Sequence, residues 1–236
     1  MKRMIASALA VALIATSTPT MTMAADKIPT TAVTTSTTSI TPGDTSVTTD
    51  TTKKSNGSVV VTDTYTDGSE VSATTTKKGA TTVVADDKSG KTEVKSTYKS
   101  TENNKNTVAV SSVSTKAKTV TVQAKIKVGK KTYKVTTIAS NAFKKATKAT
   151  TIDLSNANIT TIKKNAFKGA AKAKSIKLNG KALKVKNIDK KALAGVNKKT
   201  VTLTLICKNK TQYNKLVKAL KASGGSKITY KYKKAK

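Results

Sequence analysis

The sequence has no histidine and no tryptophan, and it has a single cysteine, Cys207. Without histidine the chain lacks the usual ligand sets of a zinc site and the usual base of a serine or cysteine hydrolase. It also lacks a glycine-rich phosphate loop, a Gly-x-Ser-x-Gly elbow and a pair of acids suited to a catalytic cleft. We therefore expect no enzyme, no cofactor, no metal and no catalytic residues.

Two positions leave an alternative open. Asp86-Asp87 stands beside a Lys-Ser-Gly sequence, which favours an exposed turn over a metal-binding position. Cys207 follows Leu205-Ile206 and is expected to be a small buried residue. Because it has no partner within the chain, the alternative is an exposed thiol that forms an intermolecular disulfide.

Aromatic residues are also scarce, at 3% of the 236 residues. A chain of this length could form one large or two small domains. With so few large side chains a single large core is not expected, whereas a narrow apolar stripe shared between repeated units is compatible with the composition.

The N-terminal quarter has the features of a targeting segment followed by a linker. Residues 1–25 combine Lys2 and Arg3, a short apolar run and small residues before position 26, which is typical of a cleaved secretory signal peptide. The alternative, an uncleaved anchor, is disfavoured because spanning a bilayer takes roughly 20 apolar residues. Residues 26–56 are rich in threonine and serine and are expected to be a disordered linker or an O-glycosylated stalk.

Residues 57–106 contain a short repeat. Gly57, Gly68, Gly79 and Gly90 are spaced by eleven residues and separate β-prone runs. Asn-Gly and Asp-Gly pairs favour two-residue turns, so the pattern predicts an antiparallel β-meander from about 58 to 99. Because this stretch has little apolar surface to bury, disorder is the alternative.

A longer repeat follows. The units 137–160 and 161–184 share eleven identical residues, and both phenylalanines, Phe143 and Phe167, occupy the same repeat position. A looser third copy places Ile188 and Leu193 where Ile162 and Phe167 stand. A period of 20–30 residues is typical of a solenoid, since one unit cannot bury its own apolar face.

The motif Val-Thr-Thr-Ile, followed by Asn-Ala-Phe, at 135–143 and its counterpart at 159–169 resemble the BspA-type leucine-rich repeat of bacterial surface proteins. Ala170 stands where that pattern has Cys, and Ser155 or Asn179 where it has Pro. The resemblance covers about 108–236. It implies an α/β repeat fold, a short solenoid over 107–236, and a role in adhesion or protein interaction.

The expected strands of this repeat domain are 150–155, 175–179 and 200–206, with a β-hairpin around 129–135 leading into the array. Tyr213, Leu216, Val217 and Leu220 have helical spacing, which predicts an amphipathic helix with Thr211 as its N-cap and Gly224-Gly225 as its end. Residues 228–232 are expected to form a closing strand, so that helix and strand cap the last coil.

Charge is unevenly divided. Residues 1–102 carry eleven Lys or Arg and ten acids, whereas 103–236 carry thirty-four Lys and two acids, Asp153 and Asp189. Such a field attracts polyanions such as wall polymers or anionic glycans, although a solvated lysine surface is the alternative. Specific nucleic-acid binding is not expected, because beyond the signal peptide there is no Arg and the aromatics form no stacking series.

Two functions follow from these observations. The first is a non-catalytic secreted or cell-surface protein that acts in adhesion or in protein or glycan interaction through alternate positions of the repeat strands. The second is a wall-associated structural protein held non-covalently to anionic envelope polymers by its lysines. The expected binding-face positions are Thr151, Asp153, Ser155, Ser175, Lys177, Asn179, Thr202 and Thr204.

Overall fold

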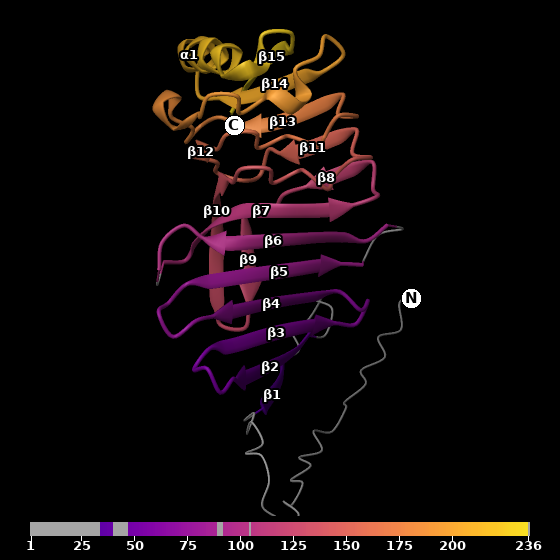
Figure 1. The fold of residues 1–236 in the computed structure, drawn as a ribbon, viewed down its shortest axis with the longest axis vertical. Coiled ribbons are helices and arrows are strands. Elements are labelled where there is room, and N and C mark those ends of the chain that lie inside the picture. The colour runs from indigo at the N-terminus through magenta and orange to yellow at the C-terminus, as the bar shows by residue number, and fades with distance from the viewer. Residues whose placement is uncertain (1–33, 40–46, 89–91, 104, 236) are drawn as a thin grey trace, which may run out of the picture. The chain divides into compact units, whose positions relative to one another are not determined.

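The computed structural model describes residues 34–39, 47–88, 92–103 and 105–235. All the described strands fall within one compact unit, Thr31–Lys236. They form two sheets (Figure 1). The first contains β1 to β7, β9, β10 and β12, and the second is a parallel sheet with the order β15-β14-β13-β11-β8. The chain is thus a strand-rich repeat protein with one α-helix in its described part, near the C-terminus.

The first sheet begins with successive antiparallel strands. These are β1 (Thr34–Ser39), β2 (Val47–Lys53), β3 (Val59–Tyr65), β4 (Glu70–Thr75), β5 (Thr81–Asp87), β6 (Val94–Ser100) and β7 (Thr107–Thr115). Neighbouring strands along the chain pair with each other throughout. Strands β1 and β2 both lie inside the segment, 26–56, expected to be a disordered linker. The threonines of β2 are β-branched, and Thr51 and Thr52 stand opposite Val61 and Val60 of β3, partners that composition alone does not reveal.

The turns of this meander differ from the two-residue turns that the sequence predicts. At Gly57, Gly68 and Gly79 the glycine N–H donates to the carbonyl three residues earlier, and only the glycine has positive φ, between 75° and 84°. This is the three-residue hairpin loop, a type I turn followed by a left-handed residue. Gly90 lies outside the described residues.

A hairpin covers the thinly packed face of the meander. It consists of β9 (Lys125–Val128) and β10 (Lys131–Ile138), which pair antiparallel on either side of Gly129. Figure 1 shows both strands running across the meander strands, and β9 contacts β3 and β4. The hairpin supplies the buried side chains of Ile126, Val128 and Tyr133. The meander therefore does not depend on its own valines alone.

The hairpin is tied to the meander by a buried carboxylate. Asp63 is 4% exposed and accepts hydrogen bonds from Thr49 Oγ1 at 2.7 Å and from the N–H of Gly129 at 2.8 Å. At the other end of the hairpin, β10 pairs in parallel with β7, and β6 pairs with β7 across position 106. Backbone hydrogen bonding is thus continuous across residue 106, where the sequence places the boundary between the meander and the repeat domain.

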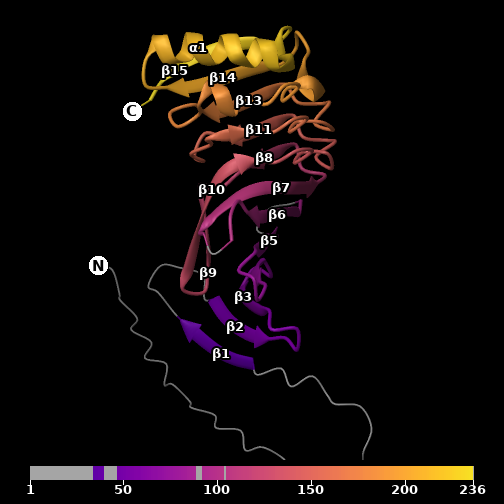
Figure 2. The same ribbon diagram turned by 60° about the vertical axis from the view of Figure 1, so that its left-hand side comes forward.

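The repeat region stacks coils of parallel strands (Figure 2). Its strands are β8 (Thr119–Thr121), β11 (Thr151–Leu154), β12 (Thr161–Ile162), β13 (Ser175–Asn179), β14 (Thr202–Cys207) and β15 (Thr229–Lys234). The 24-residue period is the pairing register, with Ile152 opposite Ile176 and Thr137 opposite Thr161. Two short 3₁₀ turns, Val185–Asn187 and Ala194–Val196, complete the third coil.

Each coil buries its apolar side chains against the next coil. The rings of Phe143 and Phe167 stack with centroids 5.2 Å apart and an interplanar angle of 7°. Both phenylalanines are fully buried, as are the inward-facing residues of the strands. These inward-facing residues are Ile152, Leu154, Ile176, Leu178, Leu203 and Leu205.

Helix α1 (Lys210–Leu220) packs on β14 beyond the last full coil and buries Leu216 and Leu220. Its N-cap is Asn209, whose side chain accepts a hydrogen bond from the N–H of Gln212 at 2.8 Å, and not Thr211 as the sequence suggests. Asn caps a helix better than Thr, and it also stands in extended conformation immediately before the first helical residue. A turn over Lys221–Gly225, in which Ser223 and Gly224 leave the helical conformation, then leads to β15.

The coil corners use a left-handed residue. Asn141, Asn165 and Lys191 are the non-glycine residues with positive φ in the described chain, at 57° to 60°. The N–H of Asn141 donates to the carbonyl of Asn165 at 3.2 Å, and that of Asn165 to the carbonyl of Lys191 at 3.1 Å. Asn tolerates this conformation better than other non-glycine residues. The third corner is therefore strained by its lysine.

Exchanging Lys191 for Asn should accordingly stabilise the fold by up to about 1 kcal/mol, because the left-handed conformation costs roughly 1–2 kcal/mol for an ordinary residue. Urea denaturation of wild type and K191N measures this difference. The reverse exchange, N165K, should destabilise by a similar amount. Equal stability of all three proteins would contradict the assignment of strain to this corner.

A second prediction concerns glycine. A Cβ at Gly169 would lie 2.3 Å from the carbonyl oxygen of Lys144 in the preceding coil, whereas one at Gly68 would meet nothing within 4 Å. Both glycines have positive φ. G68A should therefore cost only the backbone strain of roughly 1–2 kcal/mol. G169A should cost about 2–5 kcal/mol, because a clash between coils is added. Chemical denaturation of the two variants checks that G169A loses more free energy of unfolding than G68A. Equal losses would refute close packing at Gly169.

Candidate functional site

The expected binding face is the outer side of the parallel sheet, and pairing aligns its residues in rows. One row is Thr119, Thr151, Ser175, Thr202 and Thr229. The next is Thr121, Asp153, Lys177, Thr204 and Lys231. Seven of the eight expected residues are half-buried or exposed, and six of them lie in these two rows; the seventh is Ser155, just beyond β11.

The eighth residue, Asn179, is not available to a ligand. It is 5% exposed, and its side chain donates to Asn158 Oδ1 at 3.2 Å and accepts from the N–H of Lys181 at 3.1 Å. Alternation along the strand predicts an outward side chain here, but the loop after β13 folds back over this position. Asn179 shapes that loop, and Ile206 lies beside it in the pairing register.

Asp153 is bound by its neighbours. Its carboxylate accepts the N–H of Ser155 at 2.9 Å and the ammonium of Lys177 at 3.0 Å. Partial burial alone would raise the pKa of Asp153. The hydrogen bonds from Ser155 and the charge of Lys177 outweigh that effect, so the pKa lies below its usual value. Asp153 and Lys177 therefore satisfy each other, and Lys231 is the further charge at the β15 end of this row.

What remains of this face is small and polar. Its half-buried members are mainly Thr and Ser, and none is aromatic. Energetically dominant residues of protein interfaces are enriched in Trp, Tyr and Arg. The strand face thus offers hydrogen bonds at regular spacing without a large anchoring side chain.

The lysines form the most extensive polar feature of the repeat region. Every lysine from Lys105 to Lys234 is exposed. The two acids of this region are both engaged by a neighbouring coil: Asp153 with Lys177, and Asp189 with Lys163 at 4.0 Å. Nearly all of the positive charge therefore faces solvent without a carboxylate partner among the described residues.

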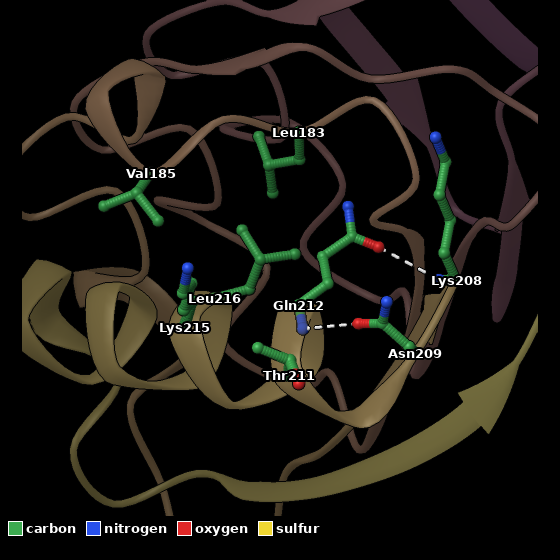
Figure 3. Close-up of a pocket in the computed structure, with 8 residues that line it drawn as sticks. All are labelled: Leu183, Val185, Lys208, Asn209, Thr211, Gln212, Lys215 and Leu216. Carbon is green, nitrogen blue, oxygen red and sulfur yellow. Dashed lines mark hydrogen bonds between the residues drawn. The ribbon is translucent and has the colours of Figure 1, made fainter.

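A cleft of about 390 Å³ lies between the loop after β13 and the start of α1 (Figure 3). Leu183, Val185 and Leu216 line it, with Lys208 and Lys215 also contributing. Val185 is 48% exposed and is the exposed large hydrophobic residue of the described chain. The Gln212 side chain anchors this region: its Nε2 donates to the carbonyl of Gly180, and its Oε1 accepts from the N–H of Lys208. Sequence reasoning missed this cleft, because it depends on the loop and helix meeting.

Cys207 is fully buried at the end of β14, and burial raises the pKa of its thiol to about 11. A Cβ on Gly180 would stand 3.1 Å from its sulfur, so packing is tight around it. An intermolecular disulfide would require the last coil to open, which favours the interpretation of a structural cysteine.

Asp86 and Asp87 do not form the exposed turn that the sequence suggests. They end β5, and Asp86 pairs with Lys95 of β6 at 3.5 Å. Within the described residues no group of three His, Cys, Asp or Glu side chains could hold a metal ion. In the same residues no helix has both the length and the hydrophobicity to cross a bilayer.

The stacked coils, parallel strands and recurring Asn-Ala-Phe corner define a repeat protein of the leucine-rich class. Residues 106–215 match the family described as the BspA-type leucine-rich repeat region, with six copies. Residues 106–215 therefore form a BspA-type leucine-rich repeat region. Searches of curated proteins and of solved structures gave no match. Repeats of this type are often found on bacterial surface proteins and in general mediate protein interaction without catalysis.

The ion pair of the strand face yields a prediction on pH. Since the pKa of Asp153 is lowered in the fold, its contribution to stability is present above its ordinary pKa of 3.8 and is lost as the pH falls below that value. D153N should lower the free energy of unfolding at pH 7 by up to about 1 kcal/mol, because Lys177 is largely solvated. This deficit should be smaller at pH 3 than at pH 7, because the contribution is lost as the pH falls through the lowered pKa.

Urea denaturation at both pH values measures the effect, with K177Q as the control. K177Q should cost less than D153N, because the hydrogen bonds from Ser155 lower the pKa of Asp153 more than Lys177 does. A deficit that stays constant with pH would show that Asp153 acts by packing and not by charge.

Proposed function

We propose that this protein is a non-catalytic, secreted or surface-associated repeat protein whose lysine-rich repeat region binds an anionic partner. The observation that carries the proposal is the exposure of every described lysine in the repeat region, together with pairing of both its acids. A field of this size favours polyanions and disfavours cationic partners. Wall polymers and anionic glycans are the polyanions available outside a bacterial cell.

The proposal includes a solenoid that is closed at both ends. The hairpin β9–β10 and strand β7 support the first coils, and α1 with β15 covers the last. Strand β15 is an edge strand that carries Lys231, Lys233 and Lys234, and charged residues on an edge oppose pairing with another chain. Such ends would keep a short array soluble.

We also propose secretion through a signal peptide at residues 1–25. The charged start, short apolar run and small residues support it.

A protein partner on the strand face is the second candidate. It is supported by the family, whose repeats in general mediate protein interaction. The rows through Thr151 and Thr204 would supply hydrogen bonds, with glycan or protein as the partner class. Because these rows carry no large anchoring side chain, binding there would be weak for each coil and would depend on several coils together.

Salt dependence tests the first candidate against the second. If lysines hold the protein to anionic envelope polymers, washing intact cells with about 1 M salt should release it, since the screening length then falls to roughly 3 Å. Immunoblotting of wash and pellet gives the released fraction. A low-salt wash with non-ionic detergent is the control and should release little. Retention at high salt would contradict the charge-based proposal and favour the strand face.

A further inference from the structure

One end of the parallel sheet carries an ordered series of lysines. The strands β8, β11, β13 and β14 begin level, as the pairing of Thr119, Thr151, Ser175 and Thr202 shows. Three residues before each of these positions stands a lysine. We call these four residues the lysine ladder: Lys116, Lys148, Lys172 and Lys199. Adjacent strands lie about 4.8 Å apart, so the ladder runs perpendicular to the strands from coil to coil.

The surroundings of the ladder are also basic. The strand-start edge consists of residues 116–118, 147–150, 171–174, 197–200 and 226–227 and contains four further exposed lysines and no acid. These are Lys118, Lys174, Lys198 and Lys227. The ammonium of Lys198 donates to the carbonyl of Ala171 at 2.9 Å and is therefore held over the neighbouring coil.

The opposite ends of β8 and β11 are different. The loops after β8 and β11 carry Gln123, Asn156 and Asn158 where the strand-start edge carries lysines. The same ends of β13 and β14 do carry lysines, among them Lys181 and Lys208. Near the ladder the acids are Asp153, which is paired with Lys177, and Glu93, whose backbone carbonyl accepts from Thr115 Oγ1 beside Lys116. Lysine is thus confined to the strand-start end for β8 and β11, whereas β13 and β14 carry lysines at both ends.

The ladder opposes folding. Like charges on successive strands lie well within the screening length of about 8 Å at physiological salt, so they repel each other in the folded chain. No carboxylate of the strand-start edge offsets this repulsion. A loss of stability of this kind is a cost that functional sites often carry.

The chemistry of the edge limits the ligand. Its side chains are only Lys, Ala, Thr, Asn and Ser, so neither a base nor a sugar ring finds an aromatic stacking platform. Lysine binds phosphate as a point charge and demands no planar partner. We infer that the lysine ladder binds a linear polyol-phosphate chain, which lies across the coils with its phosphates against lysines of successive strands. This inference rests on the proposed function and specifies its site and ligand.

The test compares two triple variants of the full chain with the same change in charge. K148Q/K172Q/K199Q removes three rungs of the ladder, and K181Q/K184Q/K186Q removes three exposed lysines at the other end of the strands. Titration calorimetry with poly(glycerol phosphate), at about 50 and about 200 mM salt, gives affinity and its salt slope. The ladder variant should lose at least about tenfold in affinity. Its slope of log affinity against log salt concentration should become less steep by about 2, at about 0.7 for each lost phosphate contact. The control variant should lose less than half as much.

Each outcome decides between the claims. Equal losses in both variants would overturn the ladder and leave the proposed charge-based function standing. No binding by wild type at low salt would overturn both. Equal or tighter binding of a sulfated glycan or of duplex DNA, with the same dependence on the ladder, would overturn the polyol-phosphate assignment.

Thermal unfolding distinguishes a binding role from a structural one. Because repulsion is relieved, the ladder variant should melt at the same or a higher temperature than wild type at low salt. A lower melting temperature would make these lysines structural and would overturn the inference.

Discussion

Stacking of equivalent coils is the constraint on which the structure depends. No single coil can cover Phe143 or Ile152, and each becomes buried only because Phe167 and Ile176 stand at the same place in the next coil. Close stacking then fixes the other features of the repeat. Gly169 is required because the preceding coil leaves no room for a Cβ, and the corner residues must adopt a left-handed backbone.

A stack also creates two ends, and the chain treats them differently. At the first end the sheet that contains β12 continues through β10 and β7 into the meander, and Asp63 fastens the hairpin to that meander. At the last end α1 covers apolar side chains, while β15 leaves a lysine-rich edge. The buried carboxylate of Asp63 therefore lies at the end where a sheet continues into the meander. The exposed lysines lie on the edge strand β15, where pairing with another chain must be prevented.

Identity between repeats predicts register well, because Thr137 and Thr161 can only pair if their coils stack. Features that arise from contacts distant in sequence are not predictable in this way. The bond between Asp63 and Gly129 spans 66 residues, and the burial of Asn179 depends on the loop that follows it. Lys191 shows a third case, since the looser copy keeps the left-handed corner without the asparagine that would reveal it. For the site, composition predicts a basic surface, but only the register shows which lysines share an edge.

The same stacking that buries the core determines what the surface can become. The inward positions hold apolar or small residues, so the residue type can vary only at the outward positions and in the loops. A residue that is repeated there recurs at the spacing of the strands. A lysine repeated in the loops therefore becomes a line of charge whose mutual repulsion the packed core must offset. A bound polyanion would remove that repulsion and stabilise the folded chain, so ligand binding and coil stacking would support each other. The charge along the stack would therefore link the stability of the fold to the binding of its partner.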